Sequence, residues 1–254
     1  MAPIAPPERA PVAAGWFSWY FRRLARRTFA GVHWGAAEDP ARWDETPIVA
    51  VANHSTWWDG PLALLLTAQL QRTFYVAMDA AQLTRYPYFT WIGARPLRRT
   101  TPRARFADLE RLGEVLQPGS MLWIFPQGER RPARAPMTGL ERGAAHLALA
   151  AAPVRVVPVA IRLSFLSEQR PEAFVRLGPS QVVGPRDIRD RKVLTEEFGT
   201  WIRWTLEETD ARIAEEQREG WHTLVAGVES VNLQLDRIGH RVGWRRGPLR
   251  DRNG

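Results

Sequence analysis

Residues 47–62, PIVAVANHSTWWDGPL, pass from an uninterrupted apolar run through a polar turn into the start of a helix. The run Ile48–Ala52 is typical of a strand that is buried on both faces of a sheet. Residues 60–71 then predict a helix, with Pro61 in its first turn. A strand followed directly by a helix is the building unit of α/β folds, so this stretch sets the expected fold class.

The same alternation continues along the chain. Helices are predicted over residues 103–116 and over an alanine-rich segment ending near residue 151, which a capping box at residues 138–141 would open. Further strands are predicted at residues 73–78, 121–125, 154–163, 174–177 and 181–183. The sequence therefore predicts an α/β fold with a mixed, largely parallel sheet flanked by helices, and ligand sites beyond the carboxyl ends of its strands.

The length of 254 residues suits one domain with appendages. A stripe of apolar residues from Phe198 to Ile213 predicts a helix, and Leu224, Val228, Val231, Leu235 and Ile238 recur at helical spacing after it. The second group predicts either a helical hairpin on the domain or a self-association surface, which leaves the oligomeric state open. The expected divisions are 1–14 as a disordered lead-in, 15–35 as an amphipathic membrane-interface helix, 36–190 as the α/β domain, 191–244 as C-terminal helices packed on it, and 245–254 as a tail.

The segment at residues 15–30, GWFSWYFRRLARRTFA, predicts a basic amphipathic helix. At 3.6 residues per turn one sector holds Trp16, Phe17, Tyr20, Phe21 and Leu24, although Trp19 falls outside it. Arg22 and Arg26 lie opposite this sector, and Arg23 and Arg27 flank it. Such a helix suits the lipid headgroup boundary, where rings enter the interface and guanidinium groups meet phosphates. The alternative is a terminal helix that packs on the core. The first reading predicts a peripheral protein on the cytoplasmic face of the cell membrane.

Composition narrows the function classes. The chain has no cysteine, which excludes disulfides, thiolate nucleophiles and cysteine-bound zinc. No apolar run approaches the roughly 18 residues that a membrane span needs. The formal charge of +8 favours polyanionic partners, namely nucleic acid, anionic lipid, a phosphorylated substrate or an acidic carrier protein. No recognised nucleic-acid motif is present, so a nucleic-acid partner is not expected.

His54 and Asp59 carry the most specific chemical signal. On a turn between a strand and a helix, residues at this spacing can come within hydrogen-bonding reach. The carboxylate would keep one ring nitrogen protonated and leave the other to accept a proton from a hydroxyl. The alternative is structural, with Asp59 as the N-cap of the helix and His54 as a loop residue. Taken alone, the pair does not decide between these readings.

Three later segments lie beside predicted strand ends. Residues 93–99 form a loop with clustered arginines, residues 125–131 follow a buried strand, and residues 156–160 carry Pro158 inside a strand-like run, which points to an edge strand or a bulge. Together with the histidine pair these segments resemble the glycerolipid acyltransferase family that includes bacterial 1-acylglycerol-3-phosphate acyltransferases. The family's motifs N-H-x4-D, a glycine loop ending in arginine, F-P-E-G-T-R and V-P-V correspond to Asn53-His54 with Asp59, Gly93 to Arg99, Phe125 to Arg130, and Val157-Pro158-Val159.

The resemblance implies acyl transfer from acyl-CoA or acyl-carrier protein to a lipid hydroxyl, without a metal or another cofactor. It makes His54 the general base and Asp59 its orienting partner, and it assigns Arg99 and Arg130 to the acceptor's phosphate. Backbone N–H groups near Gly128 would steady the thioester oxyanion. The other residues that it places at the substrate are Asn53, Phe125, Pro126, Gln127 and Gly128.

Two departures from the family pattern bear on the acceptor. Gln127 and Glu129 stand where glutamate and threonine are usual, and Arg98 replaces an acid. The expected acceptor is therefore a lysophospholipid or a related lipid, and a non-phosphoglyceride such as a glycolipid is an open alternative. Arg95, Arg98, Arg131 and Arg134 predict a very basic mouth. A lipid-binding relative without activity, and a thioester hydrolase that uses water as acceptor, are the remaining alternatives.

Overall fold

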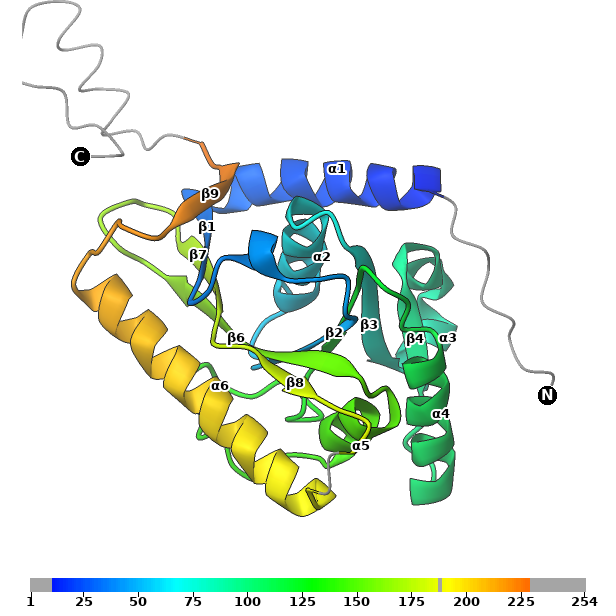
Figure 1. Cartoon of the computed structure of the whole chain (residues 1–254). Coiled ribbons are helices and arrows are strands. Elements are labelled where there is room, and N and C mark those ends of the chain that lie inside the picture. Colours follow the sequence, from blue (N-terminus) through cyan, green and yellow to red (C-terminus); the bar gives the residue numbers. More distant parts are fainter. Residues whose placement is uncertain (1–10, 187–188, 229–254) are drawn as a thin grey trace, which may run out of the picture.

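The computed structural model describes residues 11–186 and 189–228, which fold around one mixed β-sheet (Figure 1). The described residues form nine strands. Their bounds are β1 (Gly31–Ala36), β2 (Ile48–Ala52), β3 (Thr73–Asp79), β4 (Ala94–Leu97), β5 (Ser120–Ile124), β6 (Val154–Ser164), β7 (Glu172–Leu177), β8 (Gln181–Val183) and β9 (His222–Ala226).

Helices cover both faces of the sheet. They are α1 (Pro11–Thr28), α2 (Asp59–Gln69), α3 (Ala80–Arg85), α4 (Pro102–Glu114), α5 (Gly143–Ala150) and α6 (Arg191–Ala214), with 3-10 turns η1 (Pro40–Arg42) and η2 (Pro87–Ile92). In β2, Ile48 and Ala50 belong to the core under α1 and α2, whereas Val49 and Val51 belong to the core under α4, α5 and α6. Successive side chains of a strand face opposite ways, so β2 is buried on both faces, as its apolar run predicts.

The strand order is β4-β3-β5-β2-β6-β7-β1-β9, and β8 pairs with β6. The five strands from β4 to β6 run parallel, while β7 is antiparallel to β6 and parallel to β1. This confirms the predicted α/β class with a largely parallel sheet. Parallel strands end at the same edge, so the segments that follow β2, β4 and β5 meet there.

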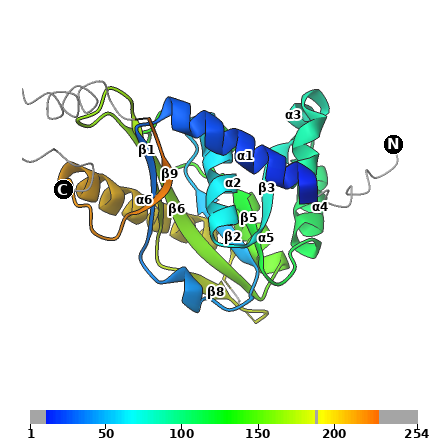
Figure 2. The same ribbon diagram turned by 90° about the horizontal axis from the view of Figure 1, so that it is seen from above.

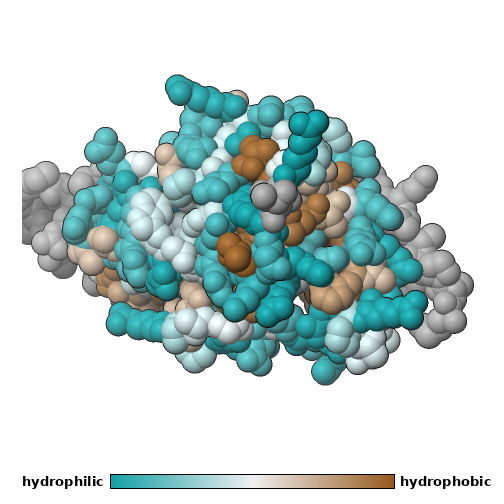
Figure 3. All heavy atoms as spheres, turned by 60° about the horizontal axis from the view of Figure 1, so that its bottom comes forward, coloured by the Kyte–Doolittle hydropathy of each residue, from teal (hydrophilic) through white to brown (hydrophobic). Residues whose placement is uncertain are grey.

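Helix α1 packs on the core and also keeps an exposed aromatic side. It contacts α2, η2 and β9, and Phe17, Phe21 and Ala25 are buried beneath it. Seen from above, it lies across α2 (Figure 2). Trp16 and Tyr20 stay exposed, with their rings stacked at 5.6 Å. The molecule's underside in the view of Figure 1 is mainly hydrophilic, with separate hydrophobic patches (Figure 3).

The bounds of this first segment differ from the predicted ones. The helix begins at Pro11 and ends at Thr28 instead of spanning residues 15–35, and β1 follows it directly. The run Gly31–Gly35 belongs to a strand that pairs with both β7 and β9. The glycines at its two ends disfavour a strand prediction from the sequence. Residues 1–10 of the predicted lead-in lie outside the described part of the chain.

The prediction of helix after residue 220 is wrong where it can be compared. Residues His222–Ala226 form β9, antiparallel to β1, with Leu224 and Val225 buried. The unpaired edge of β1 offers these residues backbone hydrogen bonds that outweigh their helical spacing. The rest of the predicted segment, residues 229–244, and the tail at 245–254 lie outside the described residues.

Pro158 lies in a central strand, so the predicted edge or bulge is wrong. Strand β6 pairs with β2 along one side, where Pro158 is opposite Val51. On the other side, pairing with β8 ends at Val156 and pairing with β7 begins at Val159. The missing N–H of Pro158 falls in this gap between two partners, where no ladder bond requires it. One edge of the sheet lies in the segment predicted as a loop, because residues 94–97 form the short edge strand β4 with Pro96 inside it.

Candidate active site

The turn between β2 and α2 brings His54 and Asp59 together. Nδ1 of His54 lies 2.7 Å from Oδ2 of Asp59. Asp59 is the first residue of α2, and the N-cap position is Trp58, so the alternative reading of Asp59 as a plain N-cap does not hold. The His54 side chain is 25% exposed, while that of Asp59 is fully buried.

Four donors converge on the carboxylate of Asp59. Oδ2 accepts from the imidazole and from the backbone N–H groups of Ser55 and Thr56, and Oδ1 accepts from the Thr56 hydroxyl. The start of a helix also favours negative charge. Since a carboxylate only accepts, His54 donates from Nδ1, which leaves Nε2 with its lone pair free to take a proton.

The backbone of His54 is tied to the segment after β5. Oε1 of Gln127 accepts from the His54 N–H at 2.5 Å, and the Arg131 N–H donates to the His54 carbonyl at 2.9 Å. Val51 is opposite Ile124 in the parallel ladder, and His54 and Gln127 each follow three residues later. The rings of His54 and Phe125 stack with centroids 4.4 Å apart. The imidazole is therefore fixed through both its side chain and its backbone.

A cavity of about 780 Å³ opens beside His54. One part is apolar and runs between α2, η2 and the strands β3 and β4. The other part is polar and contains Arg99, Gly128, Arg130 and Glu141. The apolar part is lined by Leu64, Phe74, Val76, Phe89, Ile92 and Ala94.

Glu141 is a cavity residue that sequence reasoning misplaced. The capping box that would have used it does not form, because α5 begins at Gly143 without a side-chain cap. Instead, Oε1 of Glu141 accepts from Nη2 of Arg99 at 2.7 Å, and Oε2 lies 3.4 Å from Nη1 of Arg105. Arg99 on the opposite wall of the cavity binds the carboxylate of Glu141 in place of the helix start. The local motif at residues 138–141 does not reveal this distant partner.

The predicted substrate-binding residues fall into two groups. Arg99, Phe125, Pro126, Gly128 and Arg130 line the cavity, together with His54. Asn53 and Gln127 are buried and do not line it.

The side chains of the second group have structural partners. Asn53 bonds both the N–H and the carbonyl of Ile161, which ties the end of β2 to β6, and Gln127 holds the backbone of His54. Placing these two against the substrate is therefore wrong in this structure. Buried amide groups need hydrogen-bond partners, and here the backbone at the strand ends provides them.

The predicted very basic mouth is also wrong. Arg98, which replaces the acid of the family pattern, turns away to form a bidentate pair with Asp108 on α4. Burial alone would raise the pKa of Asp108, but the hydrogen bonds and charge of Arg98 hold that pKa below its ordinary value. Arg131 donates to the carbonyls of Thr138 and Gln127, and Arg95 lies over the Tyr75 ring. Arg134 is exposed outside the cavity.

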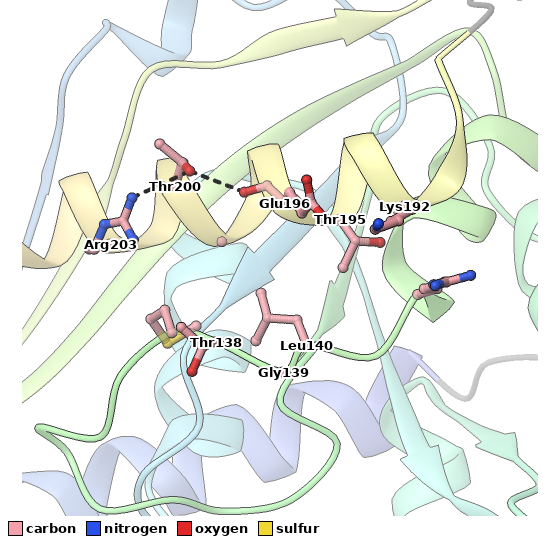
Figure 4. A pocket seen from close by; sticks show the side chains of 11 residues that line it. Thr138, Gly139, Leu140, Lys192, Thr195, Glu196, Thr200 and Arg203 are labelled. Carbon is pink, nitrogen blue, oxygen red and sulfur yellow. Dashed lines mark hydrogen bonds between the residues drawn. The ribbon is translucent and has the colours of Figure 1, made fainter.

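A second hollow of about 420 Å³ lies beside the segment that carries Glu141 (Figure 4). It separates residues 137–142 from one face of α6. Leu140 and Arg142 line this hollow, whereas Glu141 between them faces the larger cavity. No residue predicted for the site lines it.

Two properties of the described residues concern metal binding and membrane spanning. Within residues 11–186 and 189–228, no group of three or more metal-ligating side chains comes together. The helices of this same part include none with both the length and the hydropathy to cross a bilayer.

The fold and the site define a class of α/β enzyme in which a carboxylate-oriented histidine serves a cavity that is polar at one end and apolar at the other. A model of the family described as Acyltransferase matches residues 36–162, and the chain belongs to this family. The family resemblance drawn from the four motifs is thereby confirmed.

A solved structure has the same fold. It is the crystal structure of the 1-acyl-sn-glycerophosphate acyltransferase PlsC from Thermotoga maritima, which shares 18% identity and superposes with a TM-score of 0.56. The alignment covers 78% of this chain and 80% of that chain. Comparison with curated proteins gives no match.

Proposed function

We propose that the protein transfers a fatty acyl group from acyl-CoA or acyl-carrier protein to a hydroxyl of a lysophospholipid or a related lipid. The observation that carries this proposal is the geometry of His54, whose Nδ1 is held by buried Asp59 while the ring lines a cavity with polar and apolar parts. Membership of the acyltransferase family supports the reaction class.

The proposed reaction needs only the base and the two substrates. Nε2 of His54 takes the proton of the acceptor hydroxyl as its oxygen attacks the thioester carbonyl carbon. The tetrahedral intermediate collapses with cleavage of the C–S bond, and the imidazolium returns the proton to the thiolate. The new ester oxygen comes from the acceptor, so no acyl-enzyme forms.

The oxyanion of that intermediate requires nearby donors. The N–H of Gly128 donates to the Phe125 carbonyl at 3.0 Å, so this amide is already engaged. The guanidinium of Arg130 lines the same cavity and is exposed, which makes it available to a developing negative charge. We therefore assign the oxyanion contact to Arg130 ahead of the Gly128 amide.

The apolar part of the cavity fits an acyl chain. Leu64 of α2, Phe74 of β3 and Ile92 of η2 come from three different elements and enclose it from separate sides. Burying methylene groups against such walls contributes about 0.8 kcal/mol for each group. A long acyl chain therefore gains most of its binding energy here.

The direct test is a thiol-release assay. Purified protein is incubated with acyl-CoA or acyl-carrier protein and with single lipid acceptors, and the product is identified by mass. We expect thiol release that depends on the acceptor and yields an acylated lipid. Thiol release that is equally fast without any acceptor would instead identify a thioester hydrolase. No release with any donor would favour the non-catalytic alternative.

We further propose that the protein works at the cytoplasmic face of the membrane as a peripheral protein. The exposed rings of Trp16 and Tyr20 on α1 contact the buried rings of Phe17 and Phe21. These two buried rings in turn pack against exposed Tyr88 and Trp57 at the cavity mouth. Trp57 and Tyr88 also line the cavity. Arg23, Arg26 and Arg27 of α1 are exposed and line a surface hollow with Trp19, where their charges suit lipid phosphates.

Vesicle sedimentation tests this placement. Replacing Trp16 and Tyr20 together by serine should weaken binding to vesicles that contain anionic lipid by about tenfold, because both exposed rings are lost. The matched control is Trp204→Ser on α6, which removes an exposed tryptophan from another face. Equal vesicle binding by the double variant and the wild type would refute the proposed surface.

A further inference from the structure

The polar part of the catalytic cavity contains a built-in anion. The carboxylate of Glu141 pairs with Arg99 at 2.7 Å and lies 3.4 Å from Arg105. These residues come from the segment before α5, the end of β4 and helix α4, so three separate parts of the fold converge on one carboxylate. Arg99 is the arginine to which the family resemblance assigns the acceptor's phosphate.

The surrounding backbone holds Glu141 in this position. Its N–H donates to the Pro126 carbonyl at 2.7 Å, which fixes the main chain beside the segment that follows β5. Gly128 has a φ of +73° and lies so near that a Cβ there would be 2.3 Å from Oε1 of Glu141 and 2.6 Å from Nη2 of Arg99. The absence of a side chain at Gly128 leaves the room that the ion pair occupies.

The charged side chains that line the cavity balance one another. Three arginines line it, at positions 85, 99 and 130, and three carboxylates line it, at positions 79, 129 and 141. The excess of positive charge in the sequence is thus not concentrated where the substrates bind. A cavity built for a phosphate monoester would be expected to carry a positive excess.

A phosphate that approached Arg99 would meet the carboxylate of Glu141 at the same guanidinium. The phosphate and the carboxylate are both negative and would repel each other when both contact this guanidinium, and a low-dielectric cavity strengthens the repulsion. Hydroxyl groups face no such conflict, since they donate to a carboxylate and accept from a guanidinium. The Arg99–Glu141 pair presents both partners side by side.

We propose that Glu141 is a specificity-determining residue that selects acceptors with a neutral, hydroxyl-bearing headgroup, such as a glyceride or a glycosyl lipid, over acceptors with a phosphate monoester. This inference rests on the proposed function, because it concerns the acceptor of that same reaction. It assigns the selection to the Arg99–Glu141 pair and leaves the role of His54 unchanged.

Binding measurements test this proposal separately from catalysis. Isothermal titration calorimetry would compare three short-chain probes below their micelle concentrations: 1-octanoylglycerol, octyl β-glucoside and 1-octanoylglycerol-3-phosphate. We expect the wild type to bind at least one neutral probe more tightly than the phosphate. Glu141→Gln should tighten binding of the phosphate probe by about tenfold, since the repelling charge is lost and Arg99 is released. Glu114→Gln, an exposed residue on α4 outside the cavity, makes the same change in net charge and should shift no affinity by more than about threefold.

Two results would overturn the inference. One is wild-type protein that binds the phosphate probe about tenfold more tightly than both neutral probes. The other is a Glu141→Gln variant that binds the phosphate probe no better than Glu114→Gln does. Neither result depends on turnover, so failure of the acyl-transfer assay and failure of this selection are separate outcomes.

Discussion

Replacement of His54 by alanine is expected to lower kcat for acyl transfer by about 10²- to 10⁴-fold, the range that a positioned general base contributes. The imidazole is the group that lines the cavity and is held at 2.7 Å by Asp59. Without it, the acceptor hydroxyl must lose its proton to water. The measurement is the steady-state rate of thiol release with the best acceptor, followed by the mass of the product.

The control for this variant is His222→Ala on β9, which removes an exposed histidine far along the sheet from β2. Its kcat should stay within about twofold of the wild type, as expected for an exposed substitution away from the site. Both variants should retain the far-UV circular dichroism of the folded protein. A folded His54→Ala variant with undiminished kcat would remove His54 from the mechanism.

Asp59→Asn is expected to give the second-largest loss, of about 10²-fold or more in kcat, while KM for both substrates changes little. Asp59 is fully buried, does not line the cavity, and accepts its hydrogen bonds from residues 54–56 of the turn, so we expect it to act through His54 and not on the substrates. Asparagine keeps the shape but removes the charge that stabilises the imidazolium formed on proton transfer. It also offers an amide donor that favours the wrong ring tautomer.

The kcat-against-KM split distinguishes positioning from a general loss of structure. The matched control is Asp39→Asn, in which the carboxylate caps η1 by accepting from the Ala41 N–H. That variant loses the same charge on the surface and should keep both parameters. A rise in KM with unchanged kcat in Asp59→Asn would contradict the assignment, because it would indicate lost substrate binding.

The contact between His54 and Asp59 was predictable because its determinants are local. A buried run, a polar turn and a helix start lie within residues 48–62, and such a turn brings His54 to Asp59. The parallel order of the strands then places residues after β5 beside them. Alternation of strands and helices in the sequence is enough to predict that order.

The position of Glu141 could not be predicted from its local sequence motif. Thr138 and Glu141 have the spacing of a capping box, but the partner that decides the carboxylate's position is Arg99, which is 42 residues away in the sequence. A long-range ion pair leaves no periodic signal. The predicted substrate contacts of Asn53 and Gln127 are absent for a related reason. The position of a residue in a motif does not tell whether its amide points to the substrate or to a strand end.

The border formed by β1 and β9 was missed because neither segment has a clear strand pattern when its sequence is taken alone. Gly31 to Ala36 contains glycines and polar rings, and residues 222–226 continue a helical spacing of leucine and valine. β1 becomes a strand between β7 and β9, and β9 becomes a strand beside β1. Pairing of this kind is a property of the assembled sheet and not of either segment.

The pairing of β1 with β9 has a consequence for how the protein is made. Of the described strands, β1 is made first and its neighbour β9 is made last, and the Val228 N–H also bonds the Arg26 carbonyl near the end of α1. During synthesis, this border of the sheet is therefore completed only after β2 to β8 and the helices between them have been made. Such distant partners slow folding and leave apolar surface uncovered in the meantime. Until β9 is made, both α1 and the outer side of β1 lack one of their packing partners.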